Sequence, residues 1–185
     1  ARETVKALPQ LINQHNYAAA QQQWLKATQL LWDHYPVDRY LAQPEIRAMW
    51  LDRASIVRAG SEQGLAKIFD QLAAAGINTV FFETVNAGYP IYPSKVAPQQ
   101  NPLVQGWDPL AVAVKLAHKR QIELHAWVWT FAAGNRKHNA LLNLNPDYPG
   151  PLLTAHPDWA SYDNHGNLFP PGQGKPFLDP ANPGV

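Results

Sequence analysis

The order of secondary-structure signals from residue 45 onward is the feature that most constrains how this chain can fold. Residues 45–53, 77–85 and 122–129 are predicted to be strands, and the second of them is rich in the β-branched and aromatic residues of buried strands. Between these strands, residues 61–76 and 108–120 carry apolar side chains at helical spacing. The order strand, helix, strand, helix, strand predicts parallel strands joined by right-handed crossovers.

Both predicted helices have clear start signals. Ser61 precedes the first helix as an N-cap residue, and Gly76 after it allows a left-handed C-terminal stop. Asp108 followed by Pro109 combines an N-cap with a proline at the first position of the second helix. The side chains expected to form the inner face of this second helix are Leu110, Ala113, Val114 and Ala117.

Loops are predicted after each strand, at 54–60, 86–106 and 130–178. A nucleotide-binding doubly wound sheet has a Gly-rich turn after its first strand, but ASIVRAGSEQG contains neither GxGxxG nor GxxxxGK[ST]. Barrels, in contrast, build their active sites from the loops at strand C-terminal ends. We therefore predict an α/β fold, the leading part of a TIM-type (β/α)8 barrel with about three βα units. Residues 45–185 are fewer than the roughly 200–250 residues of a complete barrel.

A helical segment precedes this region. Apolar residues recur at three- and four-residue spacing within residues 1–35, and Pro9 is expected to separate a short helix from a longer one. Residues 36–44 begin and end with proline and are predicted to be a connector. We therefore divide the chain into an N-terminal segment, residues 1–44, and an incomplete barrel, residues 45–185.

Composition excludes several classes of function. The net charge is +1 and the basic residues are scattered, which argues against nucleic acid or an anionic membrane as partner. No apolar run approaches the roughly 20 residues that a membrane span needs. The chain has no cysteine, which excludes disulfides, thiol catalysis and cysteine-ligated zinc. Because no cofactor-binding motif is found either, we expect no cofactor.

The aromatic content and the N-terminus bear on ligand and location. Seven tryptophans and 17 prolines suggest ordered loops that carry flat apolar surfaces, which suit sugar rings but are also ordinary core filler. The N-terminus has no apolar signal core, so any export signal is absent or already removed. We expect an exported protein of the periplasm or cell envelope, and a cytoplasmic location stays open.

The strand IELHAWVW, residues 122–129, alternates between two kinds of side chain. The aliphatic side chains expected to face the helices are Ile122, Leu124, Ala126 and Val128. The side chains expected to point into the barrel are Glu123, His125, Trp127 and Trp129. His125 would hydrogen-bond a sugar hydroxyl or orient a carboxylate, and Trp127 or Trp129 would stack on a pyranose face. The alternative is a core histidine with satisfied hydrogen bonds among packed indoles.

Carboxylates stand near the ends of the first two strands. Glu83 and Asn86 lie near the end of the second strand, and a buried Glu is the usual general acid of glycoside cleavage. The alternative is a Glu ion-paired with Arg47 or Arg53, because buried carboxylates are usually paired. Asp52 and Arg53 end the first strand, where they would contact substrate or form a salt bridge at the rim.

We predict Glu83 and Asp52 as catalytic residues. The residues predicted to bind substrate are Arg53, Asn86, Tyr92, Ser94, Lys95, His125, Trp127 and Trp129. The polar loop also contains possible metal ligands, which are His138, His156, Asp158, Asp163, His165 and Asp179. No HExxH motif or close ligand pair occurs, so we expect these side chains to be solvated and predict no metal site.

Six segments taken together resemble one known family. They are EIRAMWLDR, AGINTVFFETVNAGYPIYPSK, GWDPLAVAVKLAHKR, ELHAWVW, HPDW and FLDPANPGV. In this order they resemble glycosyl hydrolase-like family 10, bacterial (β/α)8 proteins related to glycoside hydrolases. The resemblance covers residues 45–185 and leaves the N-terminal helices outside. Gln121 departs from the glycine that the family tends to have there, which affects a turn and not the chemistry.

The resemblance implies hydrolysis of glycosidic bonds, with bacterial cell-wall glycan as the substrate. It also implies a fourth strand with an Asp-Gly…Asp-Tyr-X-Arg-Tyr-type motif whose Asp is the catalytic acid, and this chain contains no such motif. Glycoside hydrolysis canonically needs two carboxyl groups. We therefore expect the 185-residue chain alone to be inactive.

Three hypotheses about function follow. The first is the N-terminal portion of a barrel glycoside hydrolase that acts on polysaccharide or peptidoglycan glycan. The second is a non-catalytic carbohydrate-binding or assembly module. The third makes the N-terminal helices, with Trp24 and Trp32, a partner-docking element, although a cap packed on the barrel is the simpler role. Open edges of an incomplete sheet would also favour self-association.

Overall fold

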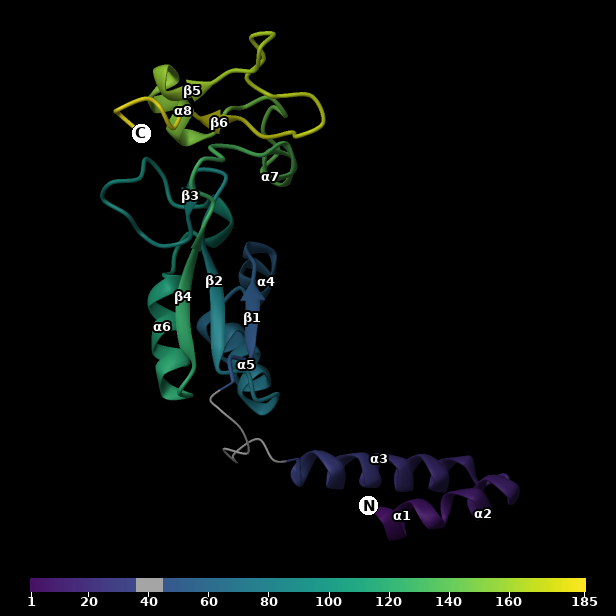
Figure 1. Cartoon of the computed structure of the whole chain (residues 1–185). Helices are drawn as coiled ribbons and strands as arrows, with labels where there is room; N and C mark the ends of the chain where they lie inside the picture. The colour runs from purple at the N-terminus through teal and green to yellow at the C-terminus, as the bar shows by residue number, and fades with distance from the viewer. Residues whose placement is uncertain (36–44) are drawn as a thin grey trace. The chain divides into compact units, whose positions relative to one another are not determined.

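The computed structural model describes residues 1–35 and 45–185 (Figure 1). The described chain forms two compact units, residues 1–45 and 46–185, and each is described by itself. The predicted connector lies outside the described residues. No helix in the described ranges is long and apolar enough to cross a membrane.

The first unit consists of three helices: α1 (Arg2–Lys6), α2 (Leu8–Asn13) and α3 (Tyr17–Asp33). Pro9 lies in the first turn of α2, so the prediction that it separates two helices was wrong. A proline is tolerated there because the first turn needs no N–H from it. The chain reverses after α2, where His15 has a φ of 56° and the Asn16 side chain caps α3. The roles predicted for Trp24 and Trp32 stay predictions.

The second unit contains a sheet with three parallel strands. β2 (Thr79–Asn86) lies between β1 (Ala48–Leu51) and β4 (Glu123–Val128), and the short β3 (Tyr89–Pro90) pairs antiparallel with the end of β2. The predicted order of parallel strands and helices is therefore confirmed as an α/β arrangement. Closure into a barrel stays a prediction.

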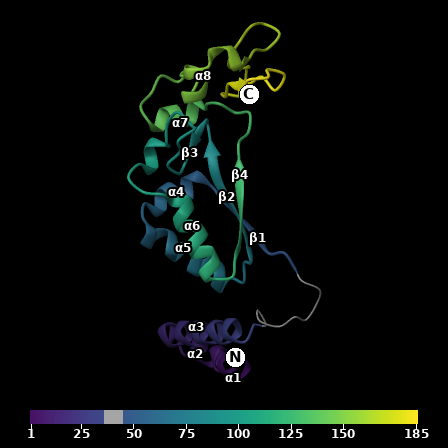
Figure 2. The ribbon, with the colours of Figure 1, turned by 90° about the vertical axis from the view of Figure 1, so that its left-hand side faces the viewer.

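Three helices cover one face of this sheet (Figure 2). They are α4 (Arg53–Ala59), α5 (Glu62–Ala74) and α6 (Pro109–Lys119). The strand side chains on this face, which pack with the helices in one buried core, include Leu51, Val80, Phe82, Ile122 and Leu124. The core side chains from the helices include Ile56, Leu65, Phe69, Ala113, Leu116 and Ala117.

The start signals of α5 and α6 are confirmed. The Ser61 hydroxyl accepts a hydrogen bond from the Gly64 N–H at 3.1 Å, and Asp108 Oδ1 accepts one from the Ala111 N–H at 2.9 Å. Gly76 has a φ of 72°, as its left-handed stop requires.

Three local predictions need correction. Residues 54–60 form most of α4 and its C-cap instead of a loop, because Asp52 is the N-cap of a helix that ends at the left-handed Gly60. On α6, Val114 is 38% exposed, and Leu116 takes its place on the buried face. On β4, Ile122 and Leu124 pack in the core as expected, but Ala126 and Val128 are exposed.

The chain after β4 folds into short elements around a small second core. These elements are α7 (Arg136–Leu141), α8 (Pro151–Ala155), η2 (Pro157–Trp159), β5 (Ala160–Ser161) and β6 (Phe177–Leu178). One more short helix, η1 (Pro102–Val104), lies in the loop between β3 and α6. The second core is made of Ala133, Leu153 and Leu178. The predicted loop is therefore largely ordered by its own packing.

Candidate functional site

The candidate site lies where the parallel strands end. Glu83 and Asn86 are near the C-terminal end of β2, and both are buried, Glu83 with 2% of its surface exposed. β1 ends one residue before Asp52, and Trp127 of β4 is the register partner of Glu83. Because side chains of partner residues point to the same side of a sheet, Glu83 and Trp127 share a face.

Both carboxylate oxygens of Glu83 are held by hydrogen bonds. Oε2 accepts one from the backbone N–H of Arg53 at 2.5 Å, and Oε1 accepts one from the side-chain amide of Asn86 at 2.6 Å. The Arg53 N–H belongs to the first turn of α4, where backbone donors lack partners within the helix. The position of the carboxylate is thus fixed by β1 and α4 on one side and by its own strand on the other.

The predicted alternative for Glu83 was pairing with Arg47 or Arg53. Arg47 donates its Nε to the Gly76 carbonyl oxygen at 2.5 Å, at the opposite end of the strands. Arg53 contacts Glu83 through its backbone N–H, while its guanidinium points elsewhere. Burial lowers the pKa of the Arg53 guanidinium, and the charges of Glu83 and Asp52 oppose that effect.

The Arg53 guanidinium joins Asn86 to a histidine that lies far along the chain. Its Nη1 donates to Asn86 Oδ1 at 3.1 Å and to Nδ1 of His138, on α7, at 2.5 Å. A guanidinium only donates, so His138 Nδ1 must accept and the ring proton is on Nε2. Burial, and then the Arg53 charge, lower the pKa of His138 to about 4. The imidazole is therefore neutral at ordinary pH.

Tyr89 completes this buried group. The ring of Tyr89 lies 5.1 Å from that of His138, between centroids, and Tyr89 on β3 is the register partner of Asn86. Burial, and then a hydrogen-bonded contact with Tyr148, raise the pKa of Tyr89. We call Glu83, Asn86, Arg53, His138 and Tyr89 the buried polar cluster.

Sequence reasoning missed two members of the buried polar cluster. His138 was expected to be solvated in a polar loop, and Tyr89 was considered only as a loop residue that contacts substrate or packs, without being predicted as a site residue. Asn135, whose side chain caps α7, was a sequence signal for a helix there. Nothing local to that stretch predicts that His138 is fully buried, because its partners Arg53 and Tyr89 come from α4 and β3.

The sheet face that Glu83 shares carries a row of rings. Trp50 stacks on Phe81 at 4.6 Å between centroids, Trp127 meets Trp50 edge-on at 4.9 Å, and His125 lies 5.3 Å from Phe81. Within residues 46–185, the helices α4, α5 and α6 pack on the other face of the sheet, and Trp50 is 58% exposed. The His125 Nε2 atom is also 3.0 Å from the Glu123 carboxylate. The row offers an aromatic surface beside a buried carboxylate.

The remaining predicted site residues are more dispersed. Asp52 Oδ1 accepts a hydrogen bond from the Ser55 N–H at 2.8 Å. Burial raises the pKa of Asp52, but the hydrogen bonds from Ser55 and the charges of nearby arginines together hold this pKa below its ordinary value. Tyr92 packs against the main core, and Lys95 is exposed. The Ser94 hydroxyl accepts from two backbone N–H groups of its own loop.

The possible metal ligands do not converge. In residues 1–35 and 45–185, no group of three or more His, Asp or Glu side chains could hold a metal ion. His156 stacks on Trp159 at 3.9 Å between centroids, and Asp163 accepts hydrogen bonds from Asn167 and His165 within its own turn.

Comparison with known proteins gives a consistent result. The family described as Glycosyl hydrolase-like 10 matches residues 45–185. The chain is 30% identical over 136 residues to "Glycosyl hydrolase YngK" of Bacillus subtilis (strain 168), a match that covers 65% of this chain and 26% of that protein. It is also 30% identical over 121 residues to "Glycosyl hydrolase DigH" of Escherichia coli (strain K12), which covers 60% and 28% respectively. The matches thus span about a quarter of the length of these relatives.

Proposed function

Because the chain belongs to the glycosyl hydrolase-like 10 family, we propose that residues 45–185 are the leading part of a (β/α)8 barrel that hydrolyses a polysaccharide. The observation that carries the proposal is the position of Glu83. This carboxylate is buried at the C-terminal end of a central parallel strand, which is where barrel enzymes place their catalytic groups. Its two hydrogen bonds hold it in one orientation before any substrate arrives.

The proposed chemistry is acid/base hydrolysis by carboxyl groups, with Glu83 as one of them. Such reactions use a second carboxyl, roughly 5–5.5 Å away for retention or 6.5–9.5 Å away for inversion. Asp52 is the other candidate, although it also caps α4. We expect the 185-residue chain alone not to turn over glycan, because a carboxylate engaged in a helix cap is poorly suited to be the second group.

The proposed substrate is a bacterial cell-wall glycan, and the proposed location is the periplasm or cell envelope. The exposed row formed by Trp50, Phe81, His125 and Trp127 supports a carbohydrate ligand, since aromatic faces suit the apolar faces of pyranose rings. The printed names of the relatives support glycoside hydrolysis in general.

A second candidate function is a carbohydrate-binding or assembly module without catalysis. The observation that favours it is the engagement of both Glu83 oxygens by Arg53 and Asn86, which is also what a purely structural carboxylate would show. In the described sheet, β1 and β4 each pair only with β2, so each has an edge through which copies of the chain could associate.

The deciding experiment compares Glu83→Gln with the matched surface variant Glu62→Gln in the full-length protein. Release of reducing ends from peptidoglycan glycan strands is measured, together with glycan binding and the melting temperature. We expect Glu83→Gln to lower kcat roughly 10²–10⁴-fold, as loss of a general acid or base does. Glu62 is half exposed on α5, so its variant should keep full activity.

Melting temperature is needed because glutamine presents an NH₂ group to one of the two donors that face Glu83. Wild-type protein that binds glycan without cleaving it would support the second candidate. Unchanged turnover in Glu83→Gln would remove Glu83 from the mechanism.

A further inference from the structure

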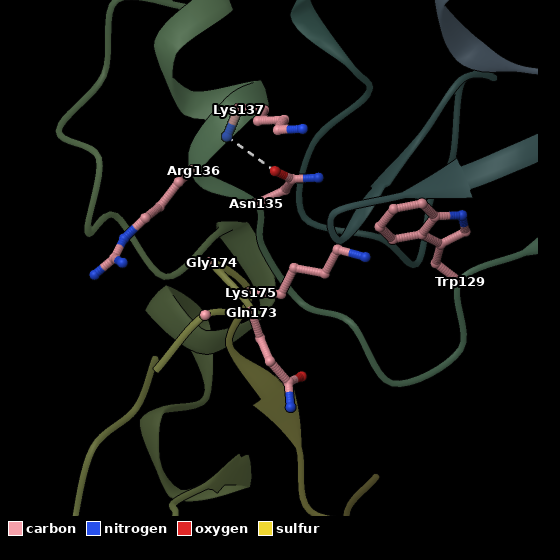
Figure 3. Close-up of a pocket in the computed structure, with 8 residues that line it drawn as sticks. Trp129, Asn135, Arg136, Lys137, Gln173, Gly174 and Lys175 are labelled. Carbon is pink, nitrogen blue, oxygen red and sulfur yellow. Dashed lines mark hydrogen bonds between the residues drawn. The ribbon is translucent and has the colours of Figure 1, made fainter. Parts of the chain in front are cut away.

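Two surfaces of the described chain lie outside the candidate site. One is a pocket of about 490 Å³ beside the start of α7, which is lined by Trp129, Lys137 and Lys175 among others (Figure 3). Trp129, which was predicted to bind substrate, lies there with its ring centroid 4.1 Å from the Lys175 ammonium, and its role stays a prediction. The other surface is an exposed apolar stripe along α3, in the first unit.

This stripe lies where α1 and α2 leave α3 uncovered. α1 and α2 run along one side of α3 (Figure 1), and the buried residues of α3 are Ala20 and Ala27. The large apolar residues that stay 58–65% exposed are Tyr17, Trp24, Leu25, Leu31 and Trp32 on α3 and Tyr35 just after it. We call these six residues the α3 stripe.

The spacing within the α3 stripe is typical of paired helices. Tyr17, Trp24 and Leu31 recur every seven residues, which keeps them on one line along the helix. Intervals of four and three residues alternate along this line, at Tyr17, Gln21, Trp24, Thr28, Leu31 and Tyr35. Two helices interlock along such a line, because the side chains of one insert between those of the other. The spacing therefore favours another helix as the partner of the α3 stripe.

The α3 stripe carries no charged residue. The charged residues of α3 are Lys26 and Asp33, which lie roughly 160–180° around the helix from Tyr17 at 3.6 residues per turn. A helix that binds an anionic membrane has a polar face rich in lysine and arginine, whereas the polar face of α3 has one charge of each sign. Two copies of the uncharged stripe bring no like charges together, so charge repulsion does not oppose their association.

The size of the first unit gives a reason for it to associate. Its described part has 35 residues, and its buried apolar residues are Ala20 and Ala27. Domains of about 40 residues or fewer usually need disulfides, a metal or oligomerisation to be stable. The chain has no cysteine, and no group of His, Asp and Glu in residues 1–35 and 45–185 could hold a metal ion. Oligomerisation is the one of these three means that the residues support.

We propose that the α3 stripe pairs with the α3 stripe of a second copy of this chain in a two-fold symmetric dimer. Two-fold dimers are the commonest assemblies, and they bury the same surface on both copies. The four aromatic residues of the stripe, at about 60% of roughly 150–250 Å² each, expose roughly 350–600 Å². Leu25 and Leu31 bring this area close to the roughly 800 Å² that each partner contributes to an interface of standard size. The proposal does not depend on the proposed function of residues 45–185.

The first measurement is the mass of the full-length protein in solution, by analytical ultracentrifugation. The concentration runs from roughly nanomolar to roughly 100 μM, because interfaces of this size dissociate in the micromolar range or below. We expect a reversible equilibrium between monomer and dimer. A monomer at every concentration would overturn the proposal.

Substitutions then locate the interface. Trp24→Glu and Leu31→Glu should each weaken dimerisation at least about 30-fold, because two-fold symmetry places the new charge on both sides of the interface. Gln22→Glu adds the same charge at an exposed position about 140° around the helix from Tyr17, so this matched control should dimerise as the wild type does. A dimer that is unchanged in both stripe variants would place the contact elsewhere, such as at the open edges of β1 and β4, and would overturn the proposal.

Hydrogen exchange tests the wild-type protein without any substitution. Exchange of the α3 amides should slow as the protein concentration rises through the dissociation constant, while exchange of the β2 amides stays constant. Slow exchange of α3 at every concentration would show that the same chain covers the stripe, and would overturn the proposal. Binding to phosphatidylglycerol vesicles that is lost in Trp24→Glu would make the stripe a membrane surface, which would also overturn it.

Discussion

Replacing His138 by Asn is expected to reduce the pH dependence of stability below pH 6.5. His138 is fully buried, and burial together with the Arg53 charge lowers its pKa from the ordinary value of 6.5 to about 4. Asparagine is the chosen replacement because its side-chain oxygen occupies roughly the position of Nδ1. It can therefore still accept the hydrogen bond from Arg53.

The expected magnitude follows from this difference in pKa. As pH falls below 6.5, the unfolded chain binds a proton at this histidine while the folded chain does not, so protonation favours unfolding. The stabilisation from the neutral imidazole is complete above pH 6.5 and is lost as pH falls to about 4. Each pH unit in that window contributes about 1.4 kcal/mol, so the free energy of unfolding falls by about 3 kcal/mol from this residue alone.

The assay is urea denaturation followed by tryptophan fluorescence at several pH values between 7 and 4. The wild-type chain should be more stable than His138→Asn at pH 7, because the smaller side chain leaves a cavity. The gap should then shrink by about 3 kcal/mol by pH 4. Contributions from other titrating groups are common to both proteins and cancel in the difference. A gap that is the same at pH 7 and pH 4 would refute a buried, neutral His138.

Two further predictions concern local structure. Asp108→Ala should lower the free energy of unfolding, measured by urea denaturation, by about 1 kcal/mol because the hydrogen bond from the Ala111 N–H is lost. Asp108→Asn, whose side-chain oxygen can still cap the helix, should stay near wild type. Equal losses in both variants would contradict a capping role. Gly150→Ala should lower the free energy of unfolding by about 3 kcal/mol, because Gly150 has a φ of 96° and a Cβ there would overlap the Ala133 carbonyl oxygen. A melting temperature unchanged from wild type would show that this turn is not built as described.

Much of the fold was predictable because its signals are local. The N-caps Ser61 and Asp108 bond to N–H groups three residues further on, so the chain segment itself carries the information. The same kind of signal was misjudged at Asp52, which was assigned to a strand end when it is the N-cap of α4. A short helix directly after a strand is easy to miss, since the single cap residue directly follows the last residue of the strand.

The candidate site was predictable only in part. Residue type and position at a strand end selected Glu83, Asn86 and Arg53, and the structure brings these three together. It does not add Tyr92, Ser94 or Lys95 to them, because Tyr92 packs in the core, Ser94 supports its own loop and Lys95 is exposed. The catalytic and binding roles themselves stay predictions.

The sequence by itself determined the βαβαβ order, the starts of α5 and α6 and the face of β4 that bears His125 and Trp127, because periodicity and capping act between near neighbours. Only the tertiary structure decided that His138 is buried against Arg53, a contact between residues 85 positions apart. It also decided that Lys137 and Lys175 meet around Trp129. Such contacts depend on how loops fold back over the strand ends, and no local periodicity or cap encodes that packing.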